Sequence, residues 1–253
     1  MPNTRIIFFG DPHGRLKAMS EAAVGYRPDA VVCLGDVYCK RSRPAKGVTA
    51  SGDTQALRDA GIPYRYIHGN HESDCSENWE GFMSLPTEES LHCRTWTHAG
   101  VVGAGLGGVF RQRIWWPGEE PKFATREDKL RATQKNIRYK GGLHFKDVTS
   151  IYPEDFADLL RASAKTHGLS FLVLHEAPDT HELGFPALTT LARGCGTPLV
   201  IHGHHHRDYE ATTPCGITVR GLALGGMWLA EFNAGGKLVR SEDLGEVKRS
   251  EEA

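Results

Sequence analysis

Apolar runs of three to five residues recur along the chain, and a polar cluster directly follows each of them. Four of these runs are continuous and occupy residues 6–9, 30–34, 171–174 and 199–201, and a mixed run occupies residues 64–67. Continuous apolar runs of this length are typical of strands that are buried on both faces, as in parallel sheets. The pattern therefore predicts five strands in the interior of the fold.

Amphipathic patterns typical of helices separate these strands. They cover residues 15–24 and 53–60, and the sequence Gly61-Ile62-Pro63 ends the second. Strands that alternate with helices pair in parallel through right-handed crossovers, which predicts an α/β fold. Weaker signals predict a helix over 78–83, a short strand near Thr95 and a further strand over 101–104.

The pattern changes after residue 207. Turn residues separate three strand-like segments at 209–212, 217–220 and 228–232, which predicts an antiparallel meander. From Ser241 the chain is charged, and we expect residues 241–253 to form a frayed tail. The predicted organisation is one domain over residues 1–240, with a basic insertion at 109–150, followed by this tail.

Side chains that bind metal ions follow each of the five predicted strands. Open α/β sheets bind ligands at the carboxyl ends of their strands, where these groups would meet. The donors are Asp11 and His13, Asp36, Asn70 and His71, His175, and His204 and His206. Taken singly, Asp11 could cap the helix at residue 15, and His71 or His175 could be structural histidines. Together these donors suit Mn²⁺, Fe or Zn²⁺ and are numerous enough to predict a dinuclear metal site.

Composition limits the classes of function. The 253 residues carry a net charge of −1 at a pI of about 6.9, so we expect neither a nucleic-acid partner nor a membrane surface. Residues 1–5 lead directly into the apolar run 6–9, which is too short for the apolar region of a signal sequence, and no apolar stretch approaches the length of a membrane span. The six cysteines show no close metal-type pairing. These features favour a cytoplasmic enzyme and leave its oligomeric state open.

One segment, residues 109–146, departs from the alternation of strands and helices. It holds ten basic and four acidic residues, a net charge of +6 in a nearly neutral chain, together with Trp115-Trp116-Pro117. One interpretation is a solvated helix over 125–138 with the tryptophan pair tucked into the core. The other is a cap beside the metal site that attracts an anionic substrate.

The order of the donor clusters resembles the calcineurin-like metallophosphoesterase superfamily. The series reads Asp-x-His from residue 11, Gly-Asp from 35, Gly-Asn-His-Glu from 69, His at 175 and Gly-His-x-His from 203. The complete ordered set is specific, although each short motif alone is not. The resemblance implies two packed mixed β-sheets flanked by helices, a four-layer αββα sandwich with the metal site at the C-terminal ends of the strands. His175-Glu176-Ala177-Pro178 looks most like the small bacterial metallophosphoesterases.

The resemblance also implies a role for each donor. Asp11, His13, Asp36 and His206 would hold one divalent ion, and Asp36 would bridge to a second ion held by Asn70, His175 and His204. Mn²⁺ is the first candidate for both ions, with Fe or Zn²⁺ as alternatives. Asp36 and His71 would be catalytic, His71 by contacting the phosphate and helping the leaving group depart. The implied reaction is hydrolysis of a phosphomonoester or phosphodiester by in-line attack of a metal-bridging hydroxide.

The substrate contacts depart from the family pattern. The first and third motifs look like the protein Ser/Thr phosphatase branch, which also expects an acidic residue and an arginine soon after the second motif. This chain instead reads Asp36-Val37-Tyr38-Cys39-Lys40-Arg41. Arg41 and Arg43 are candidates to replace the missing arginine, and Arg111 and Arg113 are candidates from the insertion. A phosphoprotein phosphatase and a non-catalytic interaction module stay as alternatives, and the intact donor set argues against the second.

Overall fold

Two mixed β-sheets form the centre of the computed structural model, which describes residues 2–248. The first sheet has the strand order β11-β10-β1-β2-β3, and the second has the order β4-β5-β6-β7-β9-β8. The strands of the first sheet are β1 (Thr4–Phe9), β2 (Ala30–Cys33), β3 (Tyr64–Tyr66), β10 (Gly226–Phe232) and β11 (Leu238–Glu246). Those of the second are β4 (Arg94–His98), β5 (Val101–Leu106), β6 (Phe171–Leu174), β7 (Leu199–His202), β8 (Tyr209–Thr212) and β9 (Thr218–Gly221).

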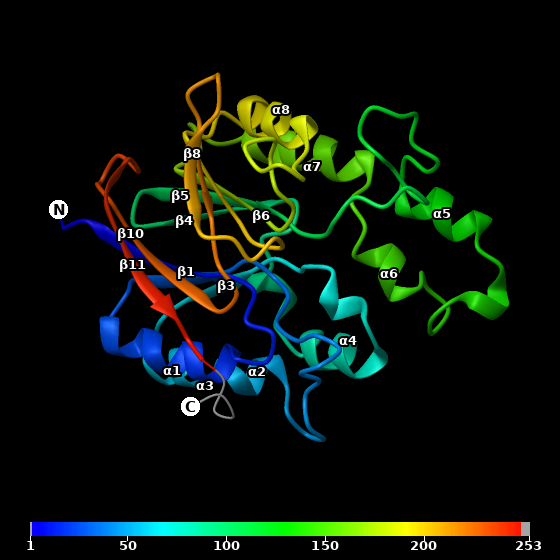
Figure 1. The fold of residues 1–253 in the computed structure, drawn as a ribbon, viewed down its shortest axis with the longest axis horizontal. Helices are drawn as coiled ribbons and strands as arrows, with labels where there is room; N and C mark the ends of the chain where they lie inside the picture. Colours follow the sequence, from blue (N-terminus) through cyan, green and yellow to red (C-terminus); the bar gives the residue numbers. More distant parts are fainter. Residues whose placement is uncertain (1, 249–253) are drawn as a thin grey trace.

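Helices cover the outer face of each sheet (Figure 1). Against the first sheet lie α1 (Leu16–Tyr26), α2 (Ala50–Asp53), α3 (Gln55–Asp59) and α4 (Ser76–Phe82), with the short 3₁₀ turns η1 (His71–Ser73) and η2 (Thr87–Glu89) nearby. Against the second lie α7 (Pro153–Ser163) and α8 (Pro186–Cys195). The insertion between β5 and β6 adds α5 (Arg126–Ala132), η3 (Lys135–Ile137) and α6 (Phe145–Val148).

Alternation of side chains along β1 explains why the fold has four layers. Ile7 and Phe9 point to the core beneath the first helical layer, whereas Ile6 and Phe8 point to the core between the sheets. Because both faces of the strand are apolar, each must be covered. A third core lies between the second sheet and α7 and α8. The predicted four-layer sandwich is confirmed.

Parallel pairing brings the ends of the donor-bearing strands together. In the first sheet β1 pairs with β2, and β2 with β3, in parallel. In the second sheet β5, β6 and β7 pair in parallel in that order. The polar loops that follow β1, β2, β3, β6 and β7 therefore meet at the carboxyl edges of the two sheets.

The predicted meander after residue 207 is only partly correct. β8 and β9 form an antiparallel pair, but β9 also continues the second sheet by pairing in parallel with β7. β10 instead crosses to the first sheet and pairs antiparallel with β1, with Ala230 opposite Ile6. Six of the seven residues of β10 are buried, so this strand needs cover on both faces and takes an interior position.

The prediction of a frayed tail from Ser241 is wrong as far as Glu246. Residues 238–246 form β11, in which Ser241 lies opposite Ala230 and Glu242 opposite Leu229 of β10. Most side chains of β11 are exposed, because it is the edge strand of its sheet. Charged residues are common on such edges, where they discourage pairing with other chains. Residues 249–253 lie outside the described part of the chain.

The helix predicted over 125–138 is shorter than expected. α5 ends at Ala132, and a separate 3₁₀ turn follows at Lys135–Ile137. The Arg138 guanidinium donates to the carbonyl oxygens of Leu130 at 2.8 Å and Thr133 at 3.1 Å. These bonds add to the capping of the last turn, where the Leu130 carbonyl oxygen also accepts from the backbone N–H of Thr133. The helix predicted over 53–60 corresponds to α3, which is shorter by two residues at its start and one at its end, and α2 precedes it.

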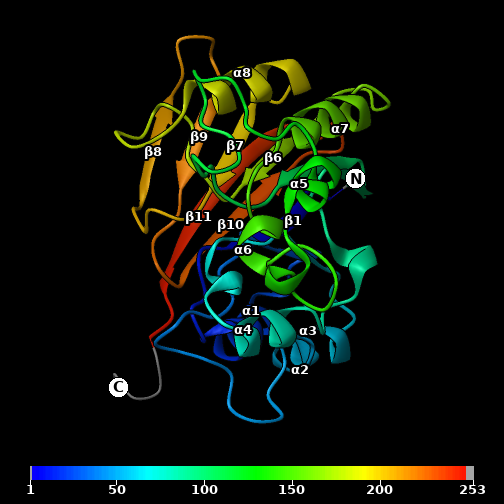
Figure 2. The same ribbon diagram turned by 90° about the vertical axis from the view of Figure 1, so that its right-hand side faces the viewer.

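The insertion extends away from the sheets beside α4 (Figure 1). Figure 2 shows α5 and α6 between the two helical layers. At its tip, Tyr139 and Lys140 both donate to Glu80 Oε1 of α4, at 3.0 and 2.9 Å. Within residues 2–248, no helix combines the length and the apolar character that crossing a bilayer requires.

A candidate metal centre at the carboxyl ends of the strands

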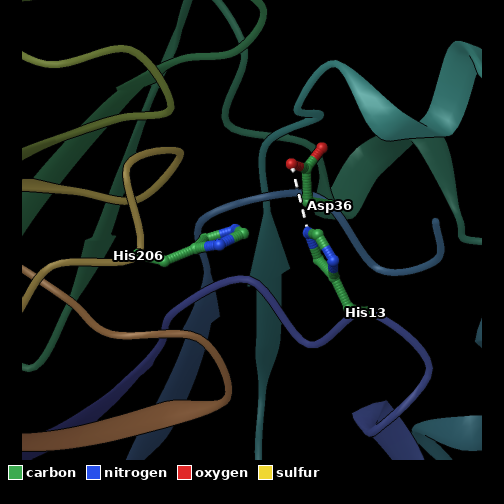
Figure 3. A group of neighbouring side chains, drawn as sticks. All are labelled: His13, Asp36 and His206. Atoms are coloured by element: carbon green, nitrogen blue, oxygen red, sulfur yellow. Dashed lines mark ion pairs between the residues drawn. The ribbon is translucent and has the colours of Figure 1, made fainter. Parts of the chain in front are cut away.

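The structure brings the predicted donors together in two overlapping groups. Ring nitrogens of His13 and His206 and a carboxylate oxygen of Asp36 lie within 4.8 Å of one another. Figure 3 shows these three side chains converging from three separate loops. The second group consists of Asp36, His175 and His204, again within 4.8 Å. Asp36 belongs to both groups and therefore lies where a bridging carboxylate is needed.

Asn70 and Asp11 complete the set. Asn70 Oδ1 lies 3.2 Å from His175 Nε2, which places the amide beside the second group. Asp11 Oδ2 accepts the backbone N–H of His204 at 2.8 Å and lies 3.9 Å from His206 Nε2. All seven donors predicted from the sequence thus surround one volume at the junction of the two sheets.

Two carboxylate oxygens at this centre are buried without a hydrogen bond. Asp11 and Asp36 are completely buried, and neither Asp11 Oδ1 nor Asp36 Oδ2 finds a hydrogen-bond donor within residues 2–248. A buried polar atom without a partner costs about 1–3 kcal/mol, and more when it is charged. Bound cations would satisfy both oxygens, so the residues present fit divalent metal ions.

The hydrogen bonds of His175 orient its ring for the same purpose. Its Nδ1 lies 2.8 Å from the carbonyl oxygen of Leu34, to which only a protonated nitrogen can donate. Nε2 then faces Asn70 Oδ1 and Asp36 Oδ2, the latter at 3.3 Å. An N–H bonded to a backbone carbonyl is the usual way in which proteins fix the orientation of a metal-binding histidine.

Five of the donors have a strained backbone conformation. The φ angles are 37° for Asp11, 45° for His13, 52° for Asp36, 70° for His204 and 53° for His206. Residues with a side chain rarely adopt positive φ, and each instance costs on the order of 1–3 kcal/mol. Because this strain is concentrated in the donor loops, it lowers the stability of the fold at the positions where the backbone directs these side chains inward.

Two motif glycines permit the close approach of the loops. A Cβ atom on Gly69 would collide with the carboxylate of Asp36 and the ring of His175. A Cβ on Gly203 would lie 2.7 Å from Asp11 Oδ1. The backbone of each loop therefore passes directly against a donor from another loop, where only glycine fits.

The histidines compensate the charge of the carboxylates. Burial disfavours ionised Asp36, but His175 and His13 outweigh it and hold the pKa of Asp36 well below its usual range. Burial likewise opposes protonation of His13 and His175, yet contacts with Asp36 raise the pKa of each to about 10, so binding of a metal ion would release a proton from each ring. Burial lowers the pKa of His204 and of His206 to about 4, so both are neutral at pH 7, the form in which imidazole binds metals. Burial also raises the pKa of Asp11 to about 7.

Comparison with known proteins identifies the family. The sequence matches the model of calcineurin-like phosphoesterases over residues 4–208, the span that holds all seven donors. This chain belongs to the calcineurin-like phosphoesterase family. An uncharacterized protein of Haemophilus influenzae is 31% identical to this phosphoesterase over 209 residues, which are 82% of this chain and 86% of that protein.

Solved structures support the same fold. A dimetal phosphatase from Danio rerio superposes with a TM-score of 0.57 at 12% identity, over 98% of this chain and 100% of that one. The protein TT1561 of Thermus thermophilus gives a TM-score of 0.57 at 16% identity, over 95% of this chain and 99% of that one. At these identities the similarity concerns the fold alone. Membership of the family makes the protein a metal-dependent hydrolase of phosphate esters.

His71 lies at the rim of the candidate metal centre. Its backbone N–H donates to Asp36 Oδ1 at 2.7 Å, and its Nε2 lies 4.0 Å from Asp36 Oδ2. Its Nδ1 lies 2.6 Å from Asp74 Oδ2, a carboxylate that can only accept. The side chain is one-third exposed. His71 is therefore held in place from behind, with the other ring nitrogen turned to the centre and accessible from solvent.

Three acids that support the donor loops have no role predicted from the sequence. Glu72 is buried and accepts from the backbone N–H of Val37 at 2.7 Å and of Gly69 at 2.8 Å, so it ties the Asp36 loop to the Asn70 loop. Asp74 holds His71, and Glu176 lies 3.3 Å from His205 Nε2. Only sequence position could have indicated these roles, since Glu72 belongs to the third motif and Glu176 directly follows His175.

The four arginines proposed to contact substrate fall into two pairs. Arg41 and Arg43 line a cavity of about 610 Å³ beside the His13 loop. Arg111 instead donates to Thr149 and Ser150, and Arg113 pairs with Asp147 at 2.6 Å. The latter pair is thus engaged in holding the insertion together.

Proposed function

We propose that this phosphoesterase uses a dinuclear centre, with Mn²⁺ as the first metal to test, to hydrolyse a phosphomonoester or a phosphodiester. The observation that carries the proposal is the position of Asp36 in both donor groups. One ion would be held by Asp11, His13, Asp36 and His206, and the other by Asp36, Asn70, His175 and His204. When bound, the ions supply charge neutralisation for the phosphoryl oxygens and activation of water near neutral pH.

The protein residues around the centre would position the ester and manage the leaving group. His71 presents Nε2 towards the centre, where it can contact the phosphate or give a proton to the departing oxygen. Asp74 fixes the ring by accepting from Nδ1, as a carboxylate does for a catalytic histidine in other hydrolases. Arg41 and Arg43 would bind the anionic substrate from the neighbouring cavity. The insertion would cover the flank of the centre formed by η1 and α4.

Positive evidence for an enzyme comes from the strained donor loops. A non-catalytic interaction module has no need to keep buried carboxylate oxygens without donors or five left-handed donor residues. Their retention supports a catalytic metal centre over a binding scaffold. Accessible His71 supports the same conclusion, because a buried structural histidine would not face solvent.

The test is hydrolysis of 4-nitrophenyl phosphate and of bis(4-nitrophenyl) phosphate by metal-stripped protein reloaded with Mn²⁺, Zn²⁺ or Fe²⁺. We expect activity that requires metal and is lost in Asp36→Asn. Asp158→Asn is the matched control, since Asp158 is half exposed on α7, where it pairs with Arg161 at 2.6 Å. Metal-independent turnover, or full activity of Asp36→Asn, would contradict the proposal.

A further inference from the structure

A cavity of about 610 Å³ opens directly beside the candidate metal centre. Gly14, which follows the donor His13, forms part of its wall, as does Tyr38, two residues after Asp36. Ser42 on the same wall donates from Oγ to the carbonyl oxygen of His13 at 2.7 Å. The cavity therefore adjoins the loops that carry the donors, and its volume is in the range of small-molecule sites.

Charge in this cavity differs from that of the protein as a whole. Five basic residues and two acidic ones line the cavity, which gives it a net charge of +3, whereas the whole chain carries a net charge of −1. Within residues 2–248, no carboxylate forms an ion pair with Lys17, Arg41 or Arg43. One of the acids, Asp53, is already engaged by the Tyr38 hydroxyl at 2.9 Å. Lys17, Arg41 and Arg43 thus remain available to an anion.

Helix α1, next to the cavity, adds to the positive electrostatic potential there. The first turn of α1, an eleven-residue helix, forms part of the cavity wall through Lys17 and Ala18. In the described part of the chain no side chain caps this helix, and its first turn holds no acidic residue. A helix start carries partial positive charge, which here acts together with the cations of the cavity.

We infer that the cavity is a second anion subsite, and that the substrate is a phosphate ester carrying a second phosphate group. The inference rests on the proposed function, since the scissile phosphate would lie at the metal centre while the second phosphate pairs with Arg41 and Arg43. Paired guanidinium groups suit phosphate in particular, because each presents two parallel N–H donors to two oxygens. A singly phosphorylated ester would leave these cations unpaired.

The first experiment compares esters that differ only in the second phosphate. Butyl phosphate is matched against butanediol and hexanediol bisphosphates, with phosphate release by the Mn²⁺-loaded protein as the readout. We expect kcat/KM for at least one bisphosphate to exceed that for butyl phosphate about tenfold, mainly through KM, as for one added charge-assisted interaction. In the double variant R41A/R43A this ratio falls to about one. Lys46→Ala, an exposed cation of the same loop outside the cavity wall, keeps the wild-type ratio.

A binding measurement separates this inference from the proposed function. Butylphosphonate and butane bisphosphonate have P–C bonds that the protein cannot hydrolyse, so calorimetry reports their affinity without turnover. We expect about tenfold tighter binding of the bisphosphonate, lost in R41A/R43A. Equal hydrolysis and equal binding of the singly and doubly charged compounds at both chain lengths would overturn the subsite and leave the phosphoesterase intact. Absence of all hydrolysis with every metal would instead refute the proposed function.

Discussion

The donor loops and the basic insertion are both rich in ionisable residues, but the partners of these residues differ between the two regions. In the donor loops, one carboxylate oxygen each of Asp11 and Asp36 is buried without a hydrogen bond from any residue between 2 and 248. In the insertion, Arg126 pairs with both Glu154 and Asp155, and Arg113 pairs with Asp147. The insertion uses its charges for its own attachment. Completely buried carboxylates that cluster with histidines, rather than a high local charge, therefore mark the candidate metal centre.

This difference predicts opposite effects of substitution in the two regions. Changes in the donor loops should affect activity more than metal-free stability, and changes in the insertion should do the reverse. Asp36→Asn is expected to give the largest effect, a loss of about a thousandfold in kcat/KM, because both ions of the proposed dinuclear centre would lose a shared ligand. Metal-free stability should change little, since an asparagine oxygen can still accept from His71 N–H. A variant that unfolds in the absence of metal would show that Asp36 is structural.

His71→Ala comes next, with an expected loss of about a hundredfold in kcat for esters of poor leaving groups. The loss should be smaller for 4-nitrophenyl phosphate, whose leaving group needs no proton. Asp74→Asn keeps the size of the side chain that holds the ring and should show the same trend to a lesser degree. If kcat of the variant depends on the leaving group in the same way as kcat of the wild type, His71 does not take part in the chemical step.

Metal removal should lower stability through the donor loops. Ligand present at about a hundred times its Kd stabilises the folded state by about 2.7 kcal/mol. For a chain of this size we expect Tm to rise by about 5–10 °C on adding Mn²⁺ to the stripped protein. Differential scanning calorimetry of wild type and Asp36→Asn measures this change, and an equal rise in both would place the bound metal elsewhere.

Arg126→Ala tests the insertion and should give the smallest effect. Burial opposes ionisation of Asp155, but His92 and Arg126 outweigh it and hold its pKa well below the usual range. A depressed pKa adds stability above the unfolded pKa of about 4, and this stability is lost as the pH falls below it. We expect a destabilisation of about 1–2 kcal/mol at pH 7, shrinking in acid, with unchanged metal affinity.

The matched control for this variant is Arg131→Ala on the same helix. Arg131 is two-thirds exposed and pairs with Asp128 and Glu127 at the surface. Its loss should leave the midpoint of urea unfolding close to that of the wild type, because exposed ion pairs contribute little to stability. If both variants lose the same stability, the effect belongs to α5 as a helix rather than to the Arg126 pair.

Apolar patterning explains why much of the fold could be predicted. Continuous runs such as residues 6–9 and 171–174 have one structural solution, a strand covered on both faces, and β1 and β6 confirm it. The position of β10 could not be predicted, because local pattern does not say which of two sheets a buried strand joins. β11 was missed because exposed edge strands carry the charges that are also typical of tails.

The candidate site likewise has some features that the sequence reveals and others that only the folded structure defines. The seven donors were named because each follows a strand end, a position that sequence reveals. Glu72 and Asp74 were given no role, because their partners are a backbone amide 35 residues away and a ring three residues back, which only the folded loops define. Left-handed backbone at Asp11 and His13 is equally invisible in a sequence, since neither residue is glycine.

Electron paramagnetic resonance of the protein loaded with two equivalents of Mn²⁺ measures directly whether Asp36 joins two ions. A shared carboxylate holds the ions close enough for their spins to couple. We expect a coupled spectrum in the wild type and its loss in Asp36→Asn. Binding of a single ion, or a wild-type spectrum of two isolated Mn²⁺ ions, would contradict the dinuclear centre.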